Sequence, residues 1–236
     1  VWTSPNTFVA TANASLYCGG GVDFVDVDAA TLNLDPRALA DKLARARRDG
    51  GKLPKVVAPV HFGGEPCRLD AIADLAREFG FRVVEDASHA VGGSFKNHAI
   101  GDGAFSDLTV FSFHPVKIVT TGEGGAITVR DPDLRDRLNL LRSHGITREA
   151  RLMRGESEGG WYYQQVDLGF NYRMTDIQAA LGTSQFQRLN AYVEAREARA
   201  RVYDAAFAGT GVGTQARAGD ARSALHLYVI RWPDDA

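Results

Sequence analysis

Short apolar runs alternate with stretches of helical periodicity in the first half of the chain, and this alternation constrains the fold most. Residues 56–60, 81–86 and 108–113 are short, apolar and rich in β-branched side chains, as buried strands are. Residues 69–79 carry apolar side chains at helical spacing and end at Gly80. Strands joined through helices pair in parallel by right-handed crossovers, and helices cover both faces of the sheet. The pattern predicts an α/β protein with a mainly parallel sheet sandwiched by helices, and excludes all-α and all-β folds.

Further elements follow from local signals. Residues 7–17 predict a helix that stops at three glycines, and residues 22–27 alternate like a strand. Asp35 opens another helix as a capping carboxylate with a proline directly after it. A long helix is predicted from about residue 175 to 207, because this stretch is dense in Ala, Arg and Glu. Residues 146–165 are polar, with Arg-rich and Gly-rich pieces, and predict a surface excursion.

The composition is that of a soluble globular protein. The chain has 236 residues, 44% of them hydrophobic and 24% charged, which is enough to bury a sizeable core. A net charge of −2 gives no sign of a nucleic-acid or membrane-surface partner. No apolar run approaches the length of a membrane span. We therefore expect a cytoplasmic protein.

The cysteines bear on disulfides and metal binding, and the chain ends bear on whether the sequence is part of a longer protein. Cys18 and Cys67 stand alone without CxxC spacing, which argues against a disulfide framework and a structural zinc site, and no metal is predicted. Both are expected to be small buried or half-buried side chains. The chain begins without Met and stops just after the apolar run 225–230, so we expect an internal segment of a longer protein.

Lys117 is the first candidate for chemistry. It follows the predicted strand 108–113 and precedes a glycine-rich turn, in the kind of connection where functional groups concentrate. Its neighbours are mostly apolar, so its ammonium loses hydration and its pKa should fall. A neutral amine is then available for Schiff-base chemistry or proton transfer. The alternative is a solvated surface lysine in a loop.

Asp86 is the second candidate. It ends the predicted strand 81–86, where a side chain enters the crevice in which open α/β sheets bind ligands. A pyridoxal phosphate enzyme needs a lysine for the Schiff base and a carboxylate that keeps the pyridine nitrogen protonated. Asp86 and Lys117 supply that pair. The alternative for Asp86 is a turn former or helix cap, and these residues alone leave both interpretations open.

Three segments in this order resemble the DegT/DnrJ/EryC1/StrS family of sugar aminotransferases. They are Val-Glu-Asp-Ala-Ser-His-Ala-Val-Gly at 84–92, Phe-Ser-Phe-His-Pro-Val-Lys at 111–117 with Gly-Glu-Gly-Gly at 122–125, and residues 169–182. The resemblance covers nearly the whole chain and implies the pyridoxal-phosphate-dependent transferase fold type I, like aspartate aminotransferase. It implies that residues 1–190 form the large cofactor-binding domain without its N-terminal part. Residues 191–236 would hold a long helix and the start of a truncated small C-terminal domain.

The resemblance also assigns roles to single residues. Lys117 would form the Schiff base with pyridoxal 5'-phosphate and then move the proton between substrate and cofactor carbons. Asp86 would pair with the pyridinium nitrogen, and Ser112 would bind the cofactor phosphate. Ser112 alone would be read as an ordinary strand serine. The family's Gly-Thr phosphate-binding turn near the start is absent, so this segment alone is expected to bind the cofactor less well.

Three more positions match the family. Phe8 would lie against a face of the cofactor ring, or else be an ordinary core aromatic. His89 replaces a glutamine found in many relatives and would lie beside the phenolic oxygen of the cofactor, or else be a hydrogen-bonded core histidine. Asn171 would reach the phosphate in the partner subunit, which requires a homodimer with shared active sites. His61 is expected to be structural, and His144 is a weak substrate-side candidate.

The family transfers an amino group from L-glutamate to a ketone on a nucleotide-linked sugar. The sequence around Lys117 and over residues 161–173 resembles that of the pseudaminic acid branch of the family, in which a UDP-linked 4-keto-6-deoxy sugar is aminated at C4. One alternative is a pyridoxal-dependent nucleotide-sugar dehydratase, disfavoured because such enzymes resemble this family with histidine in the lysine position. A second alternative is a non-catalytic regulatory relative, disfavoured by the intact candidate site. A third, an interaction module, has no sequence feature in its favour.

Overall fold

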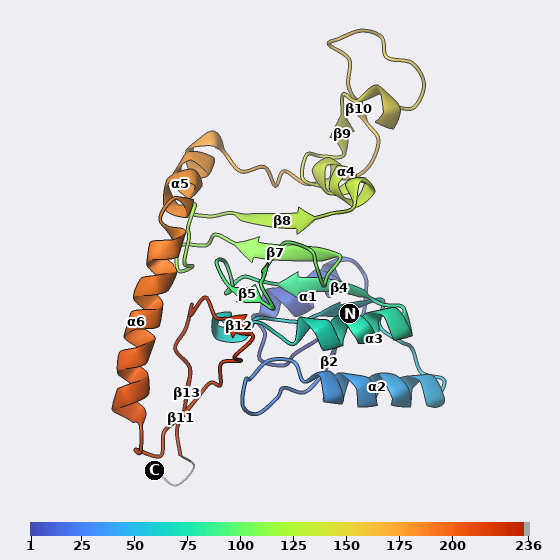
Figure 1. Ribbon diagram of the computed structural model, residues 1–236. Coiled ribbons are helices and arrows are strands. Elements are labelled where there is room, and N and C mark those ends of the chain that lie inside the picture. Colours follow the sequence, from blue (N-terminus) through green and yellow to red (C-terminus); the bar gives the residue numbers. More distant parts are fainter. Residues whose placement is uncertain (234–236) are drawn as a thin grey trace.

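A six-stranded sheet forms the centre of the computed structural model, which describes residues 1–233 (Figure 1). Across the sheet the strands lie in the order β2 (Asp23–Phe24), β1 (Trp2–Thr3), β3 (Val56–Ala58), β4 (Arg82–Asp86), β7 (Leu108–Ser112) and β8 (Gly125–Val129). All neighbouring strands are parallel except β7 and β8, which pair antiparallel. The prediction of an α/β fold with a mainly parallel sheet is confirmed.

Six α-helices and several short elements complete the described part. The helices are α1 (Val9–Tyr17), α2 (Pro36–Arg48), α3 (Leu69–Phe79), α4 (Pro132–Leu141), α5 (Asp176–Phe186) and α6 (Leu189–Phe207). Two 3₁₀ turns are η1 (Phe62–Gly64) and η2 (Ala150–Leu152). A three-stranded sheet joins β12 (Ala221–Arg222), β5 (Ser94–Phe95) and β6 (His98–Ala99). Two small antiparallel pairs are β9 (Ile146–Thr147) with β10 (Gln164–Gln165), and β11 (Gly213–Thr214) with β13 (Ile230–Arg231).

The helix ends follow the local chemistry of the sequence. The Asp35 carboxylate accepts a hydrogen bond of 2.9 Å from the backbone N–H of Arg37, and a proline occupies the first turn of α2. Gly80 ends α3 in the left-handed conformation at φ 76°, which a residue with a side chain rarely adopts. Both helix boundaries are where the sequence predicts them.

The main core lies between the sheet and the pair α2 and α3. Leu39 and Leu43 of α2 and Ile72 of α3 are fully buried with Val57 and Val83 of the sheet. Removing each large aliphatic side chain from water contributes roughly 1.5–3 kcal/mol. Helix α1 lies on the opposite face, so helices from both sides hold the strand ends in place (Figure 1).

Two sequence predictions are wrong in detail. The predicted long helix is divided into α5 and α6, because the N–H of Arg188 donates to the carbonyl of Gln185 three residues back. Such a tight turn interrupts the α-helical ladder without glycine or proline. Cys18 is exposed, because it lies after the last turn of α1 at the edge of the hollow between this helix and the sheet; Cys67 is buried, and both thiols are free.

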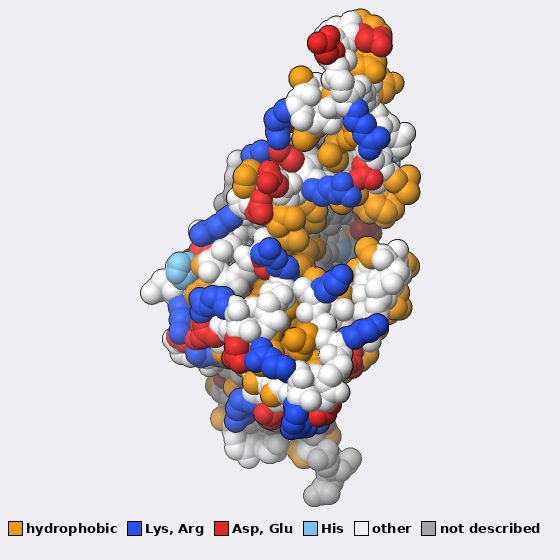
Figure 2. Space-filling model, turned by 90° about the vertical axis from the view of Figure 1, so that its right-hand side faces the viewer, with side chains coloured by type: hydrophobic (Ala, Val, Ile, Leu, Met, Phe, Trp, Pro, Cys, Tyr) orange, Lys and Arg blue, Asp and Glu red, His pale blue; other side chains and the backbone are white. Residues whose placement is uncertain are grey.

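The excursion predicted at 146–165 is confirmed as an arm that projects from the body. The arm, residues 146–166, holds β9, η2 and β10 and extends beyond α4 (Figures 1 and 2). On the face shown in Figure 2, basic and acidic side chains are interspersed. Within residues 1–233, no helix has both the length and the apolar character needed to cross a bilayer.

Candidate active site

The candidate residues follow the carboxyl ends of neighbouring parallel strands, which meet at one edge of the sheet. Asp86 ends β4, and Ser112 ends β7, with Lys117 in the loop behind it. Strands β4 and β7 are paired, with Asp86 opposite Val110. The register of one strand pair therefore brings the Asp86 and Lys117 segments together.

Asp86 is held by groups on three sides. Its backbone N–H donates to Pro59 at 2.9 Å, and its carbonyl accepts from His61 at 3.1 Å. Its Oδ2 accepts a hydrogen bond of 2.5 Å from Thr11 Oγ1, and its Oδ1 accepts one of 3.1 Å from the N–H of Ser88. The carboxylate is thus fixed in orientation, and a carboxylate offers about four acceptor positions, so lone pairs remain for a ligand.

Lys117 lies half-buried in the loop that follows β7. Its backbone N–H donates to the carbonyl of His114 at 2.9 Å. Burial lowers the pKa of the ammonium below its ordinary value, while the nearby Asp86 carboxylate acts in the opposite direction. In the described part of the chain the ammonium makes no salt bridge or hydrogen bond. The fall in pKa predicted from the sequence is confirmed.

His89 lies in the same cluster, after the turn that follows Asp86. Its ring centroid is 4.5 Å from that of His226 and 6.4 Å from that of Phe62. Burial, and then the positive charge of Lys117, lower the pKa of His89 to about 4. Its Nδ1 is buried with no hydrogen-bond partner among residues 1–233. His89 is therefore a neutral imidazole with an unused polar atom, and not the hydrogen-bonded core histidine that was the alternative.

The other candidates predicted from the sequence are Phe8, Ser112 and Asn171, and they differ in exposure and in their contacts. Phe8 precedes α1, one helical turn before Thr11, with 72% of its surface exposed. Ser112 is half-buried, and its Oγ accepts from the N–H of His114 at 3.4 Å. Asn171 is exposed and forms an isolated bridge with Ser143, near the arm. Phe8 is thus no core aromatic, and the bridge places Asn171 beside Ser143.

The two further histidines have different surroundings. His61 is fully buried, and its Nε2 lies 2.8 Å from Glu85 Oε2. It is inaccessible to a substrate, as the structural interpretation predicts. His144 adopts a left-handed backbone at φ 60°, and its N–H donates to Phe170 at 2.8 Å. It belongs to the junction between α4 and the arm.

Sequence reasoning missed two residues of the cluster. Thr11 contacts Asp86 directly and accepts a hydrogen bond of 2.8 Å from Thr7 Oγ1. The signal was present, because two threonines four residues apart share one face of the predicted helix 7–17. His226 reaches His89 from a distant part of the chain, and no local pattern indicates that contact.

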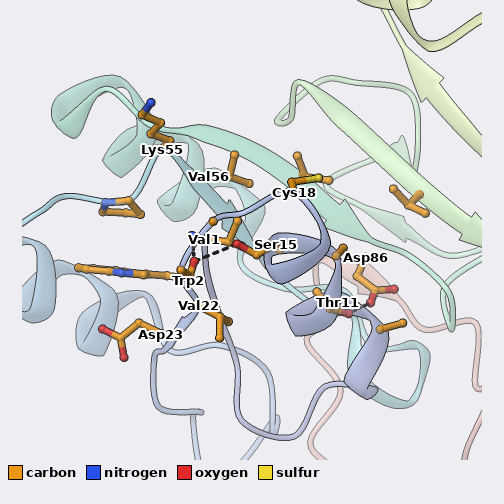
Figure 3. Close-up of a pocket in the computed structure, with 18 of the residues that line it drawn as sticks. Val1, Trp2, Thr11, Ser15, Cys18, Val22, Asp23, Lys55, Val56 and Asp86 are labelled. Carbon is orange, nitrogen blue, oxygen red and sulfur yellow. Dashed lines mark hydrogen bonds between the residues drawn. The ribbon is translucent and has the colours of Figure 1, made fainter. Parts of the chain in front are cut away.

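A hollow of about 1030 Å³ lies between α1 and the sheet (Figure 3). Its wall is mostly apolar and includes Trp2 and Val56, with Asp86 and Thr11 on the side away from Lys55 (Figure 3). Lys117 does not line it. The candidate site is therefore defined by the strand-end loops, and the hollow reaches it at Asp86 and the two residues that hold its carboxylate, Thr11 and Ser88.

Comparison with known proteins identifies relatives along the whole chain. The profile of the DegT/DnrJ/EryC1/StrS aminotransferase family matches residues 1–236. The spore coat polysaccharide biosynthesis protein SpsC of Bacillus subtilis is 40% identical over 232 residues, covering 98% of this chain and 57% of that protein. A UDP-4-amino-4,6-dideoxy-N-acetyl-beta-L-altrosamine transaminase of Campylobacter jejuni is 38% identical over 231 residues, covering 98% of this chain and 57% of that protein.

A solved structure supports the same relationship. Helicobacter pylori PseC, an aminotransferase involved in the biosynthesis of pseudoaminic acid, superposes with a TM-score of 0.86 at 30% identity. The match covers 99% of this chain and 58% of that one. The expected transferase fold type I is confirmed by this similarity. The chain spans 57% of the length of the two curated relatives described above.

Proposed function

The chain belongs to the DegT/DnrJ/EryC1/StrS aminotransferase family, and on that premise we propose that the protein transfers an amino group from L-glutamate to a nucleotide-linked keto sugar. One observation carries the proposal. Lys117 and Asp86 lie at the same edge of the sheet, and the Lys117 ammonium has a lowered pKa and no partner in the described residues. The relatives named for an activity are a transaminase and an aminotransferase, which favours amino transfer over the dehydratase alternative.

Pyridoxal 5'-phosphate fits the residues at this edge. Asp86 keeps free lone pairs for the pyridine N–H, and His89 adds a buried Nδ1 without a hydrogen-bond partner among residues 1–233. Lys117 would hold the cofactor through its amine, and Ser112 would bind its phosphate. When bound, the cofactor supplies an electron sink for the carbon next to the transferred nitrogen.

The protein's own groups then handle orientation and proton movement. Lys117, once its amine is free of the cofactor, would move the proton between the substrate carbon and the cofactor carbon, and its lowered pKa increases the neutral fraction that can accept a proton. Thr11 and Ser88 restrain the Asp86 carboxylate, which would pair with the ring nitrogen of the cofactor. Phe8 would cover one face of the ring.

We propose a UDP-linked 4-keto-6-deoxy-N-acetyl-L-altrosamine as the acceptor, aminated at C4. The named activities of the Campylobacter and Helicobacter relatives support this substrate. The reaction would take place in the cytoplasm. We also propose that residues 1–190 belong to the large domain and residues 191–236 to the long helix and the start of the small one.

We further propose that the protein acts as a homodimer in which Asn171 reaches the cofactor phosphate of the partner subunit. Large apolar side chains near Asn171 are exposed: Leu168 at 81%, Tyr172 at 73% and Ile177 at 85%. Exposed apolar side chains gathered in one region are typical of a contact surface between proteins.

The test uses the longest native form of the protein, purified with pyridoxal phosphate. Its visible absorbance is recorded before and after L-glutamate is added, and the UDP-keto sugar is then supplied. The proposal predicts that glutamate converts the bound cofactor to its amine form and that the sugar restores it with formation of an amino sugar. A spectrum that does not respond to glutamate would exclude amino transfer.

A further inference from the structure

The segment that carries His226 is fixed by main-chain contacts on both sides. The N–H of Ala224 donates to the carbonyl of Gly64, and the N–H of Leu227 donates to that of Gly63, both at 3.0 Å. These bonds attach the segment 224–227 to the turn after β3, although the two are distant in sequence. His226 is therefore placed by the fold and not by its neighbours in the chain.

Arg196 of α6 clamps the same segment from the other side. Its guanidinium donates to the carbonyls of Leu225 and His226, each at 3.1 Å. Leu225 has a left-handed backbone at φ 50°, which is uncommon for a residue with a side chain. A conformation of that kind persists when the surroundings over-determine it, and such positions cluster at functional sites.

Gly64 allows three segments to approach closely at this point. A Cβ atom on Gly64 would lie 2.8 Å from the N of Leu225, 2.9 Å from the carbonyl oxygen of His89 and 3.0 Å from the N of His226. No side chain fits there. The glycine thus lets the main chains of His89 and His226 approach the same point.

The two imidazole rings lie against each other as a result. Their centroids are 4.5 Å apart with 34° between the ring planes. The Nδ1 atoms of both rings are buried and have no partner among residues 1–233. A buried N–H without an acceptor is rarer in proteins than a buried acceptor without a donor, so the protons belong on Nε2.

Burial, reinforced by nearby positive charges, keeps both rings neutral. The positive charge of Lys117 lowers the pKa of both rings and that of Arg196 lowers the pKa of His226, whereas the negative charge of Asp86 raises the pKa of His89. Burial, followed by the repulsion from His89 and Lys117, lowers the pKa of His226 to about 3. A second positive charge beside Lys117 is thus avoided.

We propose that His226 is a positioning residue: by stacking on His89 it fixes that ring and holds it as the neutral tautomer with its proton on Nε2. The Nε2–H of His89 would then be available to an anionic oxygen of a ligand bound near Asp86 and Lys117. The identity of that ligand rests on the proposed function, whereas the stacking and the tautomer do not.

The test measures the His89 ring in the full chain without cofactor or substrate. Imidazole nitrogens labelled with ¹⁵N report tautomer and pKa by NMR. His226→Phe keeps a flat ring on His89 without an ionisable group, and His226→Gln removes the ring. His98→Gln is the matched control, because His98 pairs with Asp102 at the surface and not with His89.

We expect wild type, His226→Phe and His98→Gln to share one His89 tautomer and one low pKa. In His226→Gln the tautomers mix and the His89 pKa rises by about one unit, because water reaches the exposed ring face. An unchanged His89 in His226→Gln overturns the proposal. Equal perturbation in His226→Phe and His226→Gln overturns it too, because the ring itself would then not matter. Since no ligand is present, either outcome is independent of whether the protein transfers amino groups.

Discussion

Thr11 Oγ1 donates a hydrogen bond of 2.5 Å to Asp86 Oδ2, which connects the first turns of α1 to the end of β4. Thr11 in turn accepts from Thr7 Oγ1 at 2.8 Å, so its single hydroxyl proton is committed to the carboxylate. Two hydroxyls in series leave Asp86 little rotational freedom. The helix that precedes the site in sequence therefore sets the direction of the carboxylate that the site depends on.

Replacing Thr11 by Val removes this hydrogen bond while keeping the shape of the side chain. We expect a loss of about 1–2 kcal/mol in the free energy of unfolding, because hydrogen bonds to charged groups are stronger than average. Cofactor affinity should fall as well, since Asp86 is freer to rotate. Urea unfolding and a cofactor titration measure both effects. Thr11→Ser retains the hydroxyl and serves as the control; an equal loss in Thr11→Ser would contradict the explanation.

Lys117→Ala should abolish both the visible absorbance of bound pyridoxal phosphate and the turnover, because no other lysine among residues 1–233 lies in the cluster around Asp86. Lys117→Arg retains a positive charge but offers no amine for the Schiff base, so it should fail in the same way. Absorbance spectra and a coupled assay with L-glutamate measure the two properties. Near-wild-type turnover in Lys117→Arg would show that the positive charge, and not the amine, is what the site requires.

Asp86→Asn should separate binding from chemistry. The amide keeps an oxygen that can accept from Thr11, so the fold and much of the cofactor affinity are retained. Turnover should fall on the order of 100-fold, because a fixed charge that acts in the transition state is lost. Measuring kcat with saturating cofactor, and the dissociation constant of the cofactor separately, checks this. A variant that loses cofactor and turnover in the same proportion would place Asp86 in binding alone.

Local chemistry made much of the fold predictable. The Asp35 cap and the Gly80 stop depend on a few neighbouring residues, and the structure has them where the sequence indicated. The division of α5 from α6 was not predictable, because a tightened turn at Arg188 carries no glycine or proline as a marker.

The site was predictable only where it follows a strand end. Asp86 and Lys117 lie near the ends of strands that the periodicity identified, and the parallel sheet brings these ends together. The contact of His226 with His89 depends on how the segment after α6 returns to the turn at Gly64. Contacts of that kind arise from packing of distant segments, and a single sequence shows no pattern for them.

Glu85 and His61 form a buried pair beneath Asp86, and breaking it should cost stability. His61 Nδ1 accepts from the N–H of Cys67 at 3.0 Å, so its Nε2 donates to Glu85 Oε2 at 2.8 Å. Thr109 also donates to Glu85, at 3.0 Å. Glu85→Ala leaves these donors unpaired in the core, and we expect a loss of about 3–5 kcal/mol.

Urea unfolding of Glu85→Ala tests this value against a surface variant. Glu78→Ala removes an exposed carboxylate of α3 whose ion pair with Arg47 is 3.6 Å long and open to solvent, so its effect should stay within about 0.5 kcal/mol. A loss in Glu85→Ala no larger than that in Glu78→Ala would show that the buried pair is not important for stability.

The stacked histidines make stability depend on pH between neutral and mildly acid conditions. In the folded protein the pKa values of His89 and His226 are lowered to about 4 and about 3, whereas in the unfolded chain a histidine titrates near its usual value of about 6.5. Below that value the unfolded chain binds protons that the folded protein does not. Their contribution to stability is therefore complete above about pH 6.5 and is lost progressively as the pH falls toward about 4 and then about 3.

His226→Phe removes one of the two groups and keeps the stacked ring. The part of the stability loss between pH 7 and pH 5 that the two histidines cause in the wild type should therefore fall to about half in the variant. Urea midpoints at closely spaced pH values measure the difference between the two proteins, and other titrating groups cancel in that difference. His98→Gln is the control, because it removes a surface histidine and leaves both His89 and His226 in place, so the loss of stability that these two rings cause should remain. If the wild type and His226→Phe lose stability in parallel on acidification, His226 must bind protons equally in both states and cannot be held neutral by the fold.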